Sequence, residues 1–171
     1  MARNPKREIP PELGVSWRPA WRLGDPQIEA DARAFWARLG ALPEGVDPDL
    51  RADELVCLAY AGGEVIAAAT AFVRPIEFLR AKFAMFRCSV DPHRRMHNVA
   101  VVCTGVAREI LEAWAAAHPE EEVKGMATIL QNQDMLAQSR GAIWRTSGLT
   151  LVGYTAADEQ IRVAWFEGVR V

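Results

Sequence analysis

The clearest pattern of hydrophobic and polar positions lies between Phe83 and Trp114. Residues 83–90 are mostly apolar, carry aromatic and β-branched side chains, and have the length of a strand. A polar segment follows at residues 91–98, and after it apolar side chains recur at the spacing of one helix face. This stripe consists of Val99, Val102, Cys103, Val106, Ile110 and Trp114. The pattern predicts a strand, a tight loop and a helix in direct succession.

The loop between the expected strand and helix is basic, because it carries His93, Arg94, Arg95 and His97. The first N–H groups of a helix have no intrahelical partner, and the helix dipole is positive there. Both features favour an anion, so this loop predicts a seat for a phosphate or pyrophosphate. An ordinary solvated turn is the alternative for each of these side chains. Arg95 is the stronger candidate of the two arginines, since a helix N-terminus otherwise disfavours cations.

The rest of the chain alternates between strand and helix patterns. The remaining expected elements are an edge strand within 15–23, a helix over 25–40 capped by Asp25 and Gly40, a short helix within 41–53, a hairpin of strands 55–60 and 65–73 ended by Pro75, a strand at 123–130, a helix at 134–144 and strands at 149–154 and 160–166. The order β-α-α-β-β-β-α-β-α-β-β predicts an α/β fold with a mixed sheet. Residues 1–14 are expected to be a flexible segment and residues 15–171 a single domain.

Composition narrows the classes of function. The chain has 20 basic and 22 acidic residues, a formal net charge of -2, which argues against general nucleic-acid binding. Its three cysteines are far apart and have no metal-type spacing, so we expect neither a metal nor a disulfide framework. We also expect no signal peptide and no membrane span, and hence a cytoplasmic protein.

The element order, with a basic loop between a central strand and its helix, resembles the GNAT superfamily of acyl-CoA-dependent N-acyltransferases. The likeness covers roughly residues 15–171, and three local matches carry it. They are Trp17-Arg18-Pro19-Ala20 before the Asp-capped helix, Arg95-Met96-His97-Asn98-Val99-Ala100 against the family signature Arg/Gln-x-x-Gly-x-Gly/Ala, and Gly148-Leu149 with Gly153-Tyr154 against the pattern that opens the family's final hairpin.

The resemblance implies a GNAT-like fold that takes acetyl-CoA or another acyl-CoA as co-substrate and needs no metal. The pantetheine arm would lie along the strand end, and the pyrophosphate would sit on the loop amides. The cofactor contacts implied in this way are Cys88, Ser89, Val90, Arg94, Arg95, Met96, His97, Asn98, Val99, Ala100 and Asn132. For Asn132, a helix cap is an equally open role.

The sequence departs from the family pattern where catalysis would be expected. Asn98 stands at the first signature glycine, and Trp144 stands where the family commonly has a tyrosine as acid. The expected central strand carries no glutamate, so the nearest candidate base is Glu77 and the candidate acid is Tyr154. Arg87 is the candidate to hold an acidic substrate.

Two functions of different classes follow from these features. The leading hypothesis is an N-acetyltransferase that transfers an acyl group from acetyl-CoA to the amine of a small molecule or protein. The alternative is a non-catalytic GNAT-fold module that binds acyl-CoA or a protein partner. A third hypothesis, a domain that binds another phosphate ligand such as a nucleotide, has no glycine-rich motif to support it. The resemblance also favours a homodimer.

Overall fold

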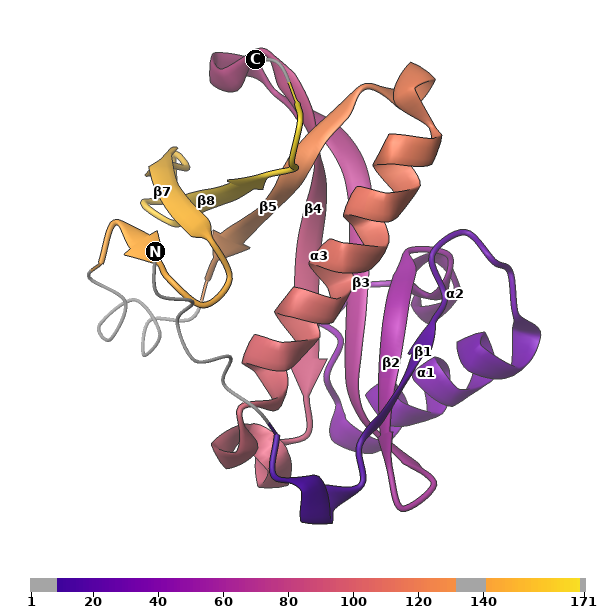
Figure 1. Ribbon diagram of the computed structural model, residues 1–171. Coiled ribbons are helices and arrows are strands. Elements are labelled where there is room, and N and C mark those ends of the chain that lie inside the picture. Colours follow the sequence, from indigo (N-terminus) through magenta and orange to yellow (C-terminus); the bar gives the residue numbers. More distant parts are fainter. Residues whose placement is uncertain (1–8, 132–140, 170–171) are drawn as a thin grey trace. The chain divides into compact units, whose positions relative to one another are not determined.

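The computed structural model describes residues 9–131 and 141–169, except the side chains of Met96 and His97. In these ranges the chain forms an eight-stranded mixed sheet and three α-helices (Figure 1). The helices are α1 (Pro26–Leu39), α2 (Pro48–Ala52) and α3 (Val99–Ala117). The strands are β1 (Ser16–Pro19), β2 (Leu55–Ala61), β3 (Glu64–Ile76), β4 (Ala81–Val90), β5 (Val123–Leu130), β6 (Ile143–Trp144), β7 (Leu149–Tyr154) and β8 (Gln160–Trp165). The expected α/β class is confirmed.

The strands hydrogen-bond in the order β1-β2-β3-β4-β5-β8-β7-β6. The described residues form two compact units, and β3, β4 and α3 contribute residues to both. The N-terminal unit comprises residues 9–71 and 87–111. The C-terminal unit comprises residues 72–86, 112–131 and 141–169. Each unit has its own cluster of buried apolar side chains.

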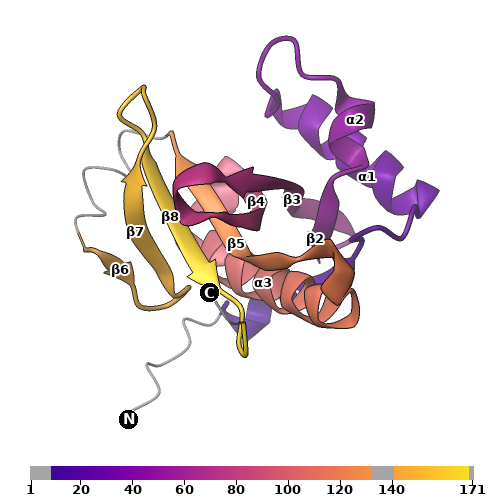
Figure 2. The same ribbon diagram turned by 90° about the horizontal axis from the view of Figure 1, so that it is seen from above.

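In the C-terminal unit, β4 and β5 are parallel neighbours, as expected from the helix between them. Their pairing runs from Lys82↔Val123 to Met85↔Ala127. Both strands then continue, β4 to Val90 and β5 to Leu130, while β5 pairs with β8 along its whole length. Figure 2 shows β8, β7 and β6 following one another beyond β5. The parallel pairing of β4 and β5 therefore ends within the length of both strands.

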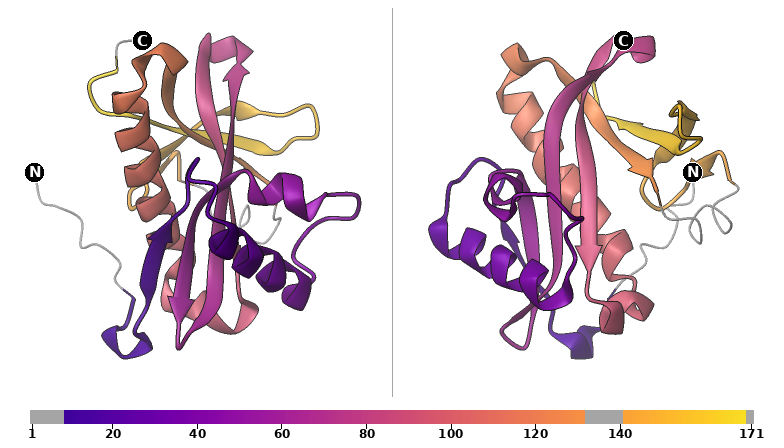
Figure 3. Two further views of the ribbon diagram at one scale, coloured as in Figure 1. Left: turned by 90° about the vertical axis from the view of Figure 1, so that its right-hand side faces the viewer. Right: turned by 180° about the vertical axis from the view of Figure 1, so that it is seen from behind.

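In the N-terminal unit, α1 and α2 lie on one face of β2 and β3, and the first part of α3 lies on the other (Figure 3). Helix α1 begins and ends as its sequence predicts. Asp25 accepts hydrogen bonds from the N–H groups of Gln27 and Ile28, and Gly40 ends the helix in the left-handed conformation at φ 56°. The face of α1 that meets the sheet is apolar. Its buried residues are Ile28, Ala32, Phe35 and Trp36, which pack with Leu55, Leu58, Val65 and Ala68.

Two expected element boundaries are wrong. The helix expected at 134–144 does not reach its predicted end, because Ile143 and Trp144 form β6 and pair with β7. Gly148 closes this hairpin with an N–H bond of 2.8 Å to the Trp144 carbonyl and a φ of 74° that other residues avoid. The remainder of the expected helix lies outside the described residues. Pro75 does not end β3, since the fixed φ of proline is compatible with extended backbone.

Two glycines give opposite predictions for stability. A Cβ on Gly125 in β5 would lie 2.5 Å from the Ala164 carbonyl oxygen and 3.0 Å from the Phe83 ring, whereas a Cβ on Gly105 in α3 would meet nothing within 4 Å. We expect Gly125→Ala to lower the free energy of unfolding by about 1–3 kcal/mol. Gly105→Ala is expected to raise it by about 1 kcal/mol, because alanine is the better helix former. Urea unfolding followed by circular dichroism measures both, and equal effects of the two changes would contradict the packing of β5.

Candidate functional site

The turn that follows β4 is organised by one buried carboxylate, Asp91, in the N-terminal unit. The side-chain Oδ1 of Asp91 accepts a hydrogen bond from the N–H of His93 at 3.0 Å, and its backbone carbonyl accepts one from the N–H of Arg94 at 2.8 Å. Its own N–H donates to the carbonyl of Ile66 in β3 at 2.9 Å, and Oδ2 accepts from Arg38 Nη1 of α1 at 3.2 Å. The turn is therefore tied to a strand and to a helix at its first residue.

These contacts keep Asp91 ionised. Burial raises the pKa of the Asp91 carboxyl, but the N–H of His93 and the guanidinium of Arg38 lower it more, so the net pKa lies below its ordinary value. Sequence analysis did not single out Asp91 as more than part of the loop. The signal was present in the Asp-Pro pair, which is a common start for a helical turn.

The polar segment after β4 forms a tight turn that leads directly into α3, as the sequence pattern predicts. Pro92–His97 form a 3-10 turn, and Asn98 then takes the left-handed conformation with φ 58° and ψ 12°. Helix α3 begins at the next residue, and the N–H of Val102 donates to the Asn98 carbonyl at 3.0 Å. Asparagine tolerates this conformation better than most residues other than glycine. Asn98 thus allows the same sharp turn into the helix that a glycine would allow.

The structure places the expected phosphate contacts on this turn and the helix start. Arg95 and Ala100 are exposed, Arg94 and Asn98 are half-buried, and Val99 is buried in the core. The backbone positions of Met96 and His97 belong to the same 3-10 turn. The N–H groups of Val99 and Ala100 stand in the first turn of α3, where no carbonyl of the same helix is available to them. The arrangement is suited to an anion such as a pyrophosphate.

The end of β4 carries the residues expected along the pantetheine arm. Cys88 and Ser89 are half-buried and Val90 is buried. Hydrogen bonds with the Cys57 and Cys88 thiols, together with burial, raise the pKa of the Cys103 thiol well above its ordinary value. A thiol of this kind stays protonated and is a poor nucleophile. The three cysteines therefore form part of the packing between β2, β4 and α3.

Arg87, the expected substrate contact, lies in a small cluster of charges. Its guanidinium pairs with Glu54, which also accepts from Arg51 Nε at 3.5 Å. Burial lowers the pKa of Arg87 and so does Arg51, while Glu54 opposes that shift. Two guanidinium groups share one carboxylate, so the cluster keeps a net positive charge. Glu54 was missed in the sequence, where it is one acidic residue before an apolar strand.

In the C-terminal unit, a pocket of about 380 Å³ lies beside the point where β4 and β5 stop pairing. Its walls are apolar apart from Arg74 and Glu77. The lining residues are Arg74, Pro75, Ile76, Glu77, Phe78, Met85, Ile129 and Ile161. Met85 is the last residue of β4 that pairs with β5, and Glu77 is exposed in a 3-10 turn before β4. Among the described residues, the Glu77 side chain makes no ion pair. The expected base is therefore a carboxylate at the rim of an apolar pocket.

Tyr154, the expected acid, is not part of the pocket wall. It stands at the end of β7 with 54 % of its surface exposed. Its neighbour Gly153 approaches the pocket residue Phe78, because a Cβ there would lie 3.3 Å from the Phe78 ring. Tyr154 is thus near a lining residue without being one.

Trp144 has a packing role. The guanidinium carbon of Arg162 lies 4.3 Å from the centre of the Trp144 ring, and Arg162 is fully buried. Arg162 donates to Gln160 Oε1 and to the Gly141 carbonyl, both at 2.9 Å. Burial lowers the pKa of Arg162. The two acceptor oxygens replace the water that the buried guanidinium has lost. Arg162 was not predicted, since a single arginine in a strand gives no sign of burial.

Three further features are Asn132, metal binding and membrane-spanning helices. Asn132 falls outside the described residues. Over residues 9–131 and 141–169 there is no group of three or more His, Cys, Asp or Glu that could hold a metal ion. No helix in the same ranges is both long and apolar enough to cross a membrane.

No protein-family model matches the chain, and no curated protein matches it by sequence. Solved structures do match its fold. An acetyltransferase of the GNAT family from Streptococcus pneumoniae superimposes with a TM-score of 0.58 at 13% identity, covering 89% of this chain and 99% of the other. A GNAT-family acetyltransferase from Desulfovibrio desulfuricans gives 0.54 at 15% identity, with coverage of 88% and 98%.

A third structure, Arabidopsis thaliana NAA60 in complex with acetyl-CoA, gives a TM-score of 0.54 at 11% identity and covers 89% of this chain and 99% of its own. The fold expected from the sequence is therefore confirmed. At such identities the likeness extends to the fold alone.

The Asp91 carboxylate makes stability depend on pH. Its pKa is lower in the folded chain than in the unfolded one, so its contribution is complete above the unfolded value of about 3.9 and is lost as pH falls through the folded value. We expect Asp91→Asn to lower the free energy of unfolding by about 2 kcal/mol at pH 7 and by much less near pH 3. Urea unfolding at both pH values measures the difference, with Glu64→Gln as an exposed control. A deficit of equal size at both pH values would contradict this role.

Proposed function

We propose that this chain, which has the fold of the GNAT acetyltransferases, is an acyl-CoA-dependent N-acyltransferase. The observation that carries the proposal is the turn from β4 into α3. There Asn98 adopts the left-handed conformation at the signature position, and α3 begins at the next residue. The likeness to NAA60 in complex with acetyl-CoA supports the same co-substrate for this chain.

The cofactor half of the site would use backbone more than side chains. The pyrophosphate would accept N–H groups from the turn and the start of α3, with Arg95 adding a guanidinium from the exposed side. Asp91 would act by positioning, because it fixes the first residues of the turn to β3 and α1. A pre-shaped turn lowers the entropy lost when the ligand binds.

The acceptor half would use the pocket beside Met85. An amine that enters it would give up a proton to Glu77 and attack the thioester carbonyl, so that a C–N bond forms. The C–S bond then breaks, and the coenzyme A thiolate takes a proton from an acid, for which Tyr154 is our candidate.

Arg87 remains the candidate to bind an acidic group of the acceptor. Its guanidinium is shared with Glu54, so it would act through the net positive charge of the Arg51–Glu54–Arg87 cluster. The acceptor would be the amine of a small molecule or of a protein.

A non-catalytic module that binds acyl-CoA or a protein partner is the second candidate. It is favoured by Tyr154, which is 54 % exposed and lies outside the pocket wall, so that among the described residues no candidate acid lines the pocket with Glu77. The two candidates share the cofactor turn and differ at the acceptor pocket. Turnover of any amine by the wild-type chain at a rate that depends on Glu77 would exclude the second candidate.

Binding of the cofactor is tested by calorimetric titration with acetyl-CoA and with free coenzyme A. We expect micromolar affinity that weakens as salt is added, and about a tenfold loss on Arg95→Ala, since one charge-assisted hydrogen bond is removed. Asn98→Gly is expected to keep or tighten binding, because glycine adopts the same φ without a side chain. Arg80→Ala serves as the control for loss of one exposed positive charge. Unchanged affinity in Arg95→Ala would refute the phosphate assignment.

Catalysis is tested by following release of the coenzyme A thiol with a panel of amines. We expect Glu77→Gln to lower kcat by about 100-fold while the affinity for acetyl-CoA stays unchanged, because the amide cannot accept the proton. Tyr154→Phe is expected to lower kcat by a smaller factor. Glu64→Gln, an exposed glutamate on β3, is the matched control. A wild-type rate in Glu77→Gln would assign the base to another group.

A further inference from the structure

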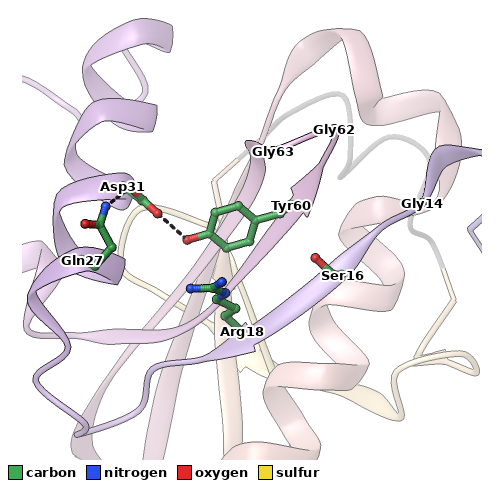
Figure 4. A pocket seen from close by; sticks show the side chains of 8 residues that line it. All are labelled: Gly14, Ser16, Arg18, Gln27, Asp31, Tyr60, Gly62 and Gly63. Carbon is green, nitrogen blue, oxygen red and sulfur yellow. Dashed lines mark hydrogen bonds between the residues drawn. The ribbon is translucent and has the colours of Figure 1, made fainter.

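The N-terminal unit contains a polar pocket of about 420 Å³ that the proposed acyl transfer does not use (Figure 4). It lies between the start of β1, the first turns of α1 and the β2–β3 hairpin. Its lining side chains are Ser16, Arg18, Gln27, Asp31 and Tyr60, and three glycines complete the wall. The volume is at the lower end of the range for small-molecule sites, which favours a small ligand.

The strand register places three of these side chains on the same face of the sheet. Ser16 pairs with Tyr60 and Arg18 pairs with Leu58, and side chains two apart on a strand point to the same side. Leu58 is buried in the cluster that α1 covers, so this is the α1 face. The first turns of α1 thus supply Gln27 and Asp31 from the opposite wall.

A rigid network holds the Asp31 carboxylate in that wall. The hydroxyl of Tyr60 donates to Asp31 Oδ2 and the amide of Gln27 donates to Oδ1, each at 2.8 Å. Burial and the neighbouring carboxylate raise the pKa of Tyr60 to about 12, so the phenol keeps its proton and remains a donor at neutral pH. A carboxylate has about four acceptor positions, and two are used here. Asp31 therefore stays oriented and can accept a further donor.

The pocket also contains a positive charge, that of Arg18, close to Tyr60. The guanidinium carbon of Arg18 lies 5.5 Å from the centre of the Tyr60 ring, an arrangement that fixes the cation against the aromatic face. In the described part of the chain, Arg18 makes no ion pair and no side-chain hydrogen bond. Figure 4 shows its guanidinium beside the hydroxyl end of Tyr60 rather than out along β1. Its planar fork is suited to a carboxylate.

The glycines keep the pocket open. A Cβ built on Gly14, Gly62 or Gly63 would meet nothing within 4 Å, and all three have positive φ. Gly62 and Gly63 form the hairpin turn, at φ 59° and 83°. Larger side chains would both strain this turn and project into the open space around it.

We propose that this pocket binds a small zwitterion of the α-amino-acid type, with its carboxylate on Arg18 and its ammonium group on Asp31. A simple anion would leave Asp31 without a counter-charge, and a simple amine would leave Arg18 without one. The lining is mainly polar and carries one charged group of each sign, which disfavours ligands with a large hydrophobic part. The proposal is independent of acyl transfer, since none of these residues belongs to the cofactor turn or to the pocket beside Met85.

The test uses nuclear magnetic resonance titration of the full chain with glycine and with its two halves, acetate and methylammonium. The amide signals of Gly14 before β1 and of Gly62 and Gly63 in the hairpin turn report on the pocket from two sides. We expect saturable shifts with glycine and with L-alanine, and about tenfold weaker binding of either half, because each half forms only one of the two charged contacts.

Variants locate the two contacts. Arg18→Gln and Asp31→Asn should each weaken glycine binding by about tenfold, and Arg18→Gln should leave methylammonium binding unchanged. Arg22→Gln, an exposed arginine of the same segment, is the matched control. Acetate that binds as tightly as glycine would overturn the zwitterion in favour of a plain anion site. The absence of saturable shifts at the three glycines would overturn the site itself.

Discussion

The geometry of the candidate cofactor site depends on one buried ion, the carboxylate of Asp91. A buried carboxylate is costly unless it is fully hydrogen-bonded, so its partners are fixed once it is buried. The partners of the carboxylate come from α1 and from the turn itself, and the backbone N–H of the same residue donates to β3. The position of the turn is thereby defined by the core of the N-terminal unit. The left-handed Asn98 can therefore be held in a conformation that it would seldom adopt alone.

The structure gives more support to the proposed binding of a cofactor than to the proposed catalysis. The candidate cofactor turn is built from backbone geometry, which tolerates changes of side chain, and Asn98 adopts the left-handed conformation that a glycine would also adopt. Proton transfer requires specific side chains at specific distances. Glu77 is placed at a pocket, while Tyr154 is only near one of its walls. A fold can retain the first property while the second changes, which is why the two candidate functions separate at the acceptor pocket.

The sequence predicted the elements whose patterns are local. The cap of α1 by Asp25, its end at Gly40 and the parallel pair β4–β5 follow from short-range rules of capping and connection. The short strand β6 was missed because two residues carry too little periodicity to oppose a helix assignment. The burial of Arg162 and the pairing of Arg87 with Glu54 could not be predicted, since each depends on contacts between residues distant in sequence. The candidate site was therefore predicted as a loop, but not as a set of contacts.

The three cysteines give the N-terminal unit an internal reporter. Cys57 and Cys103 are completely buried between the sheet and α3, and the raised pKa of Cys103 suppresses its thiolate further. Only the thiolate reacts with alkylating reagents. Modification of Cys103 must therefore wait for α3 to move away from the sheet, and its rate measures how often that helix opens. The same helix begins at the candidate cofactor turn. The rate at which Cys103 of the wild-type chain is alkylated, compared with and without a ligand on that turn, would therefore measure how far the ligand restrains the opening of α3.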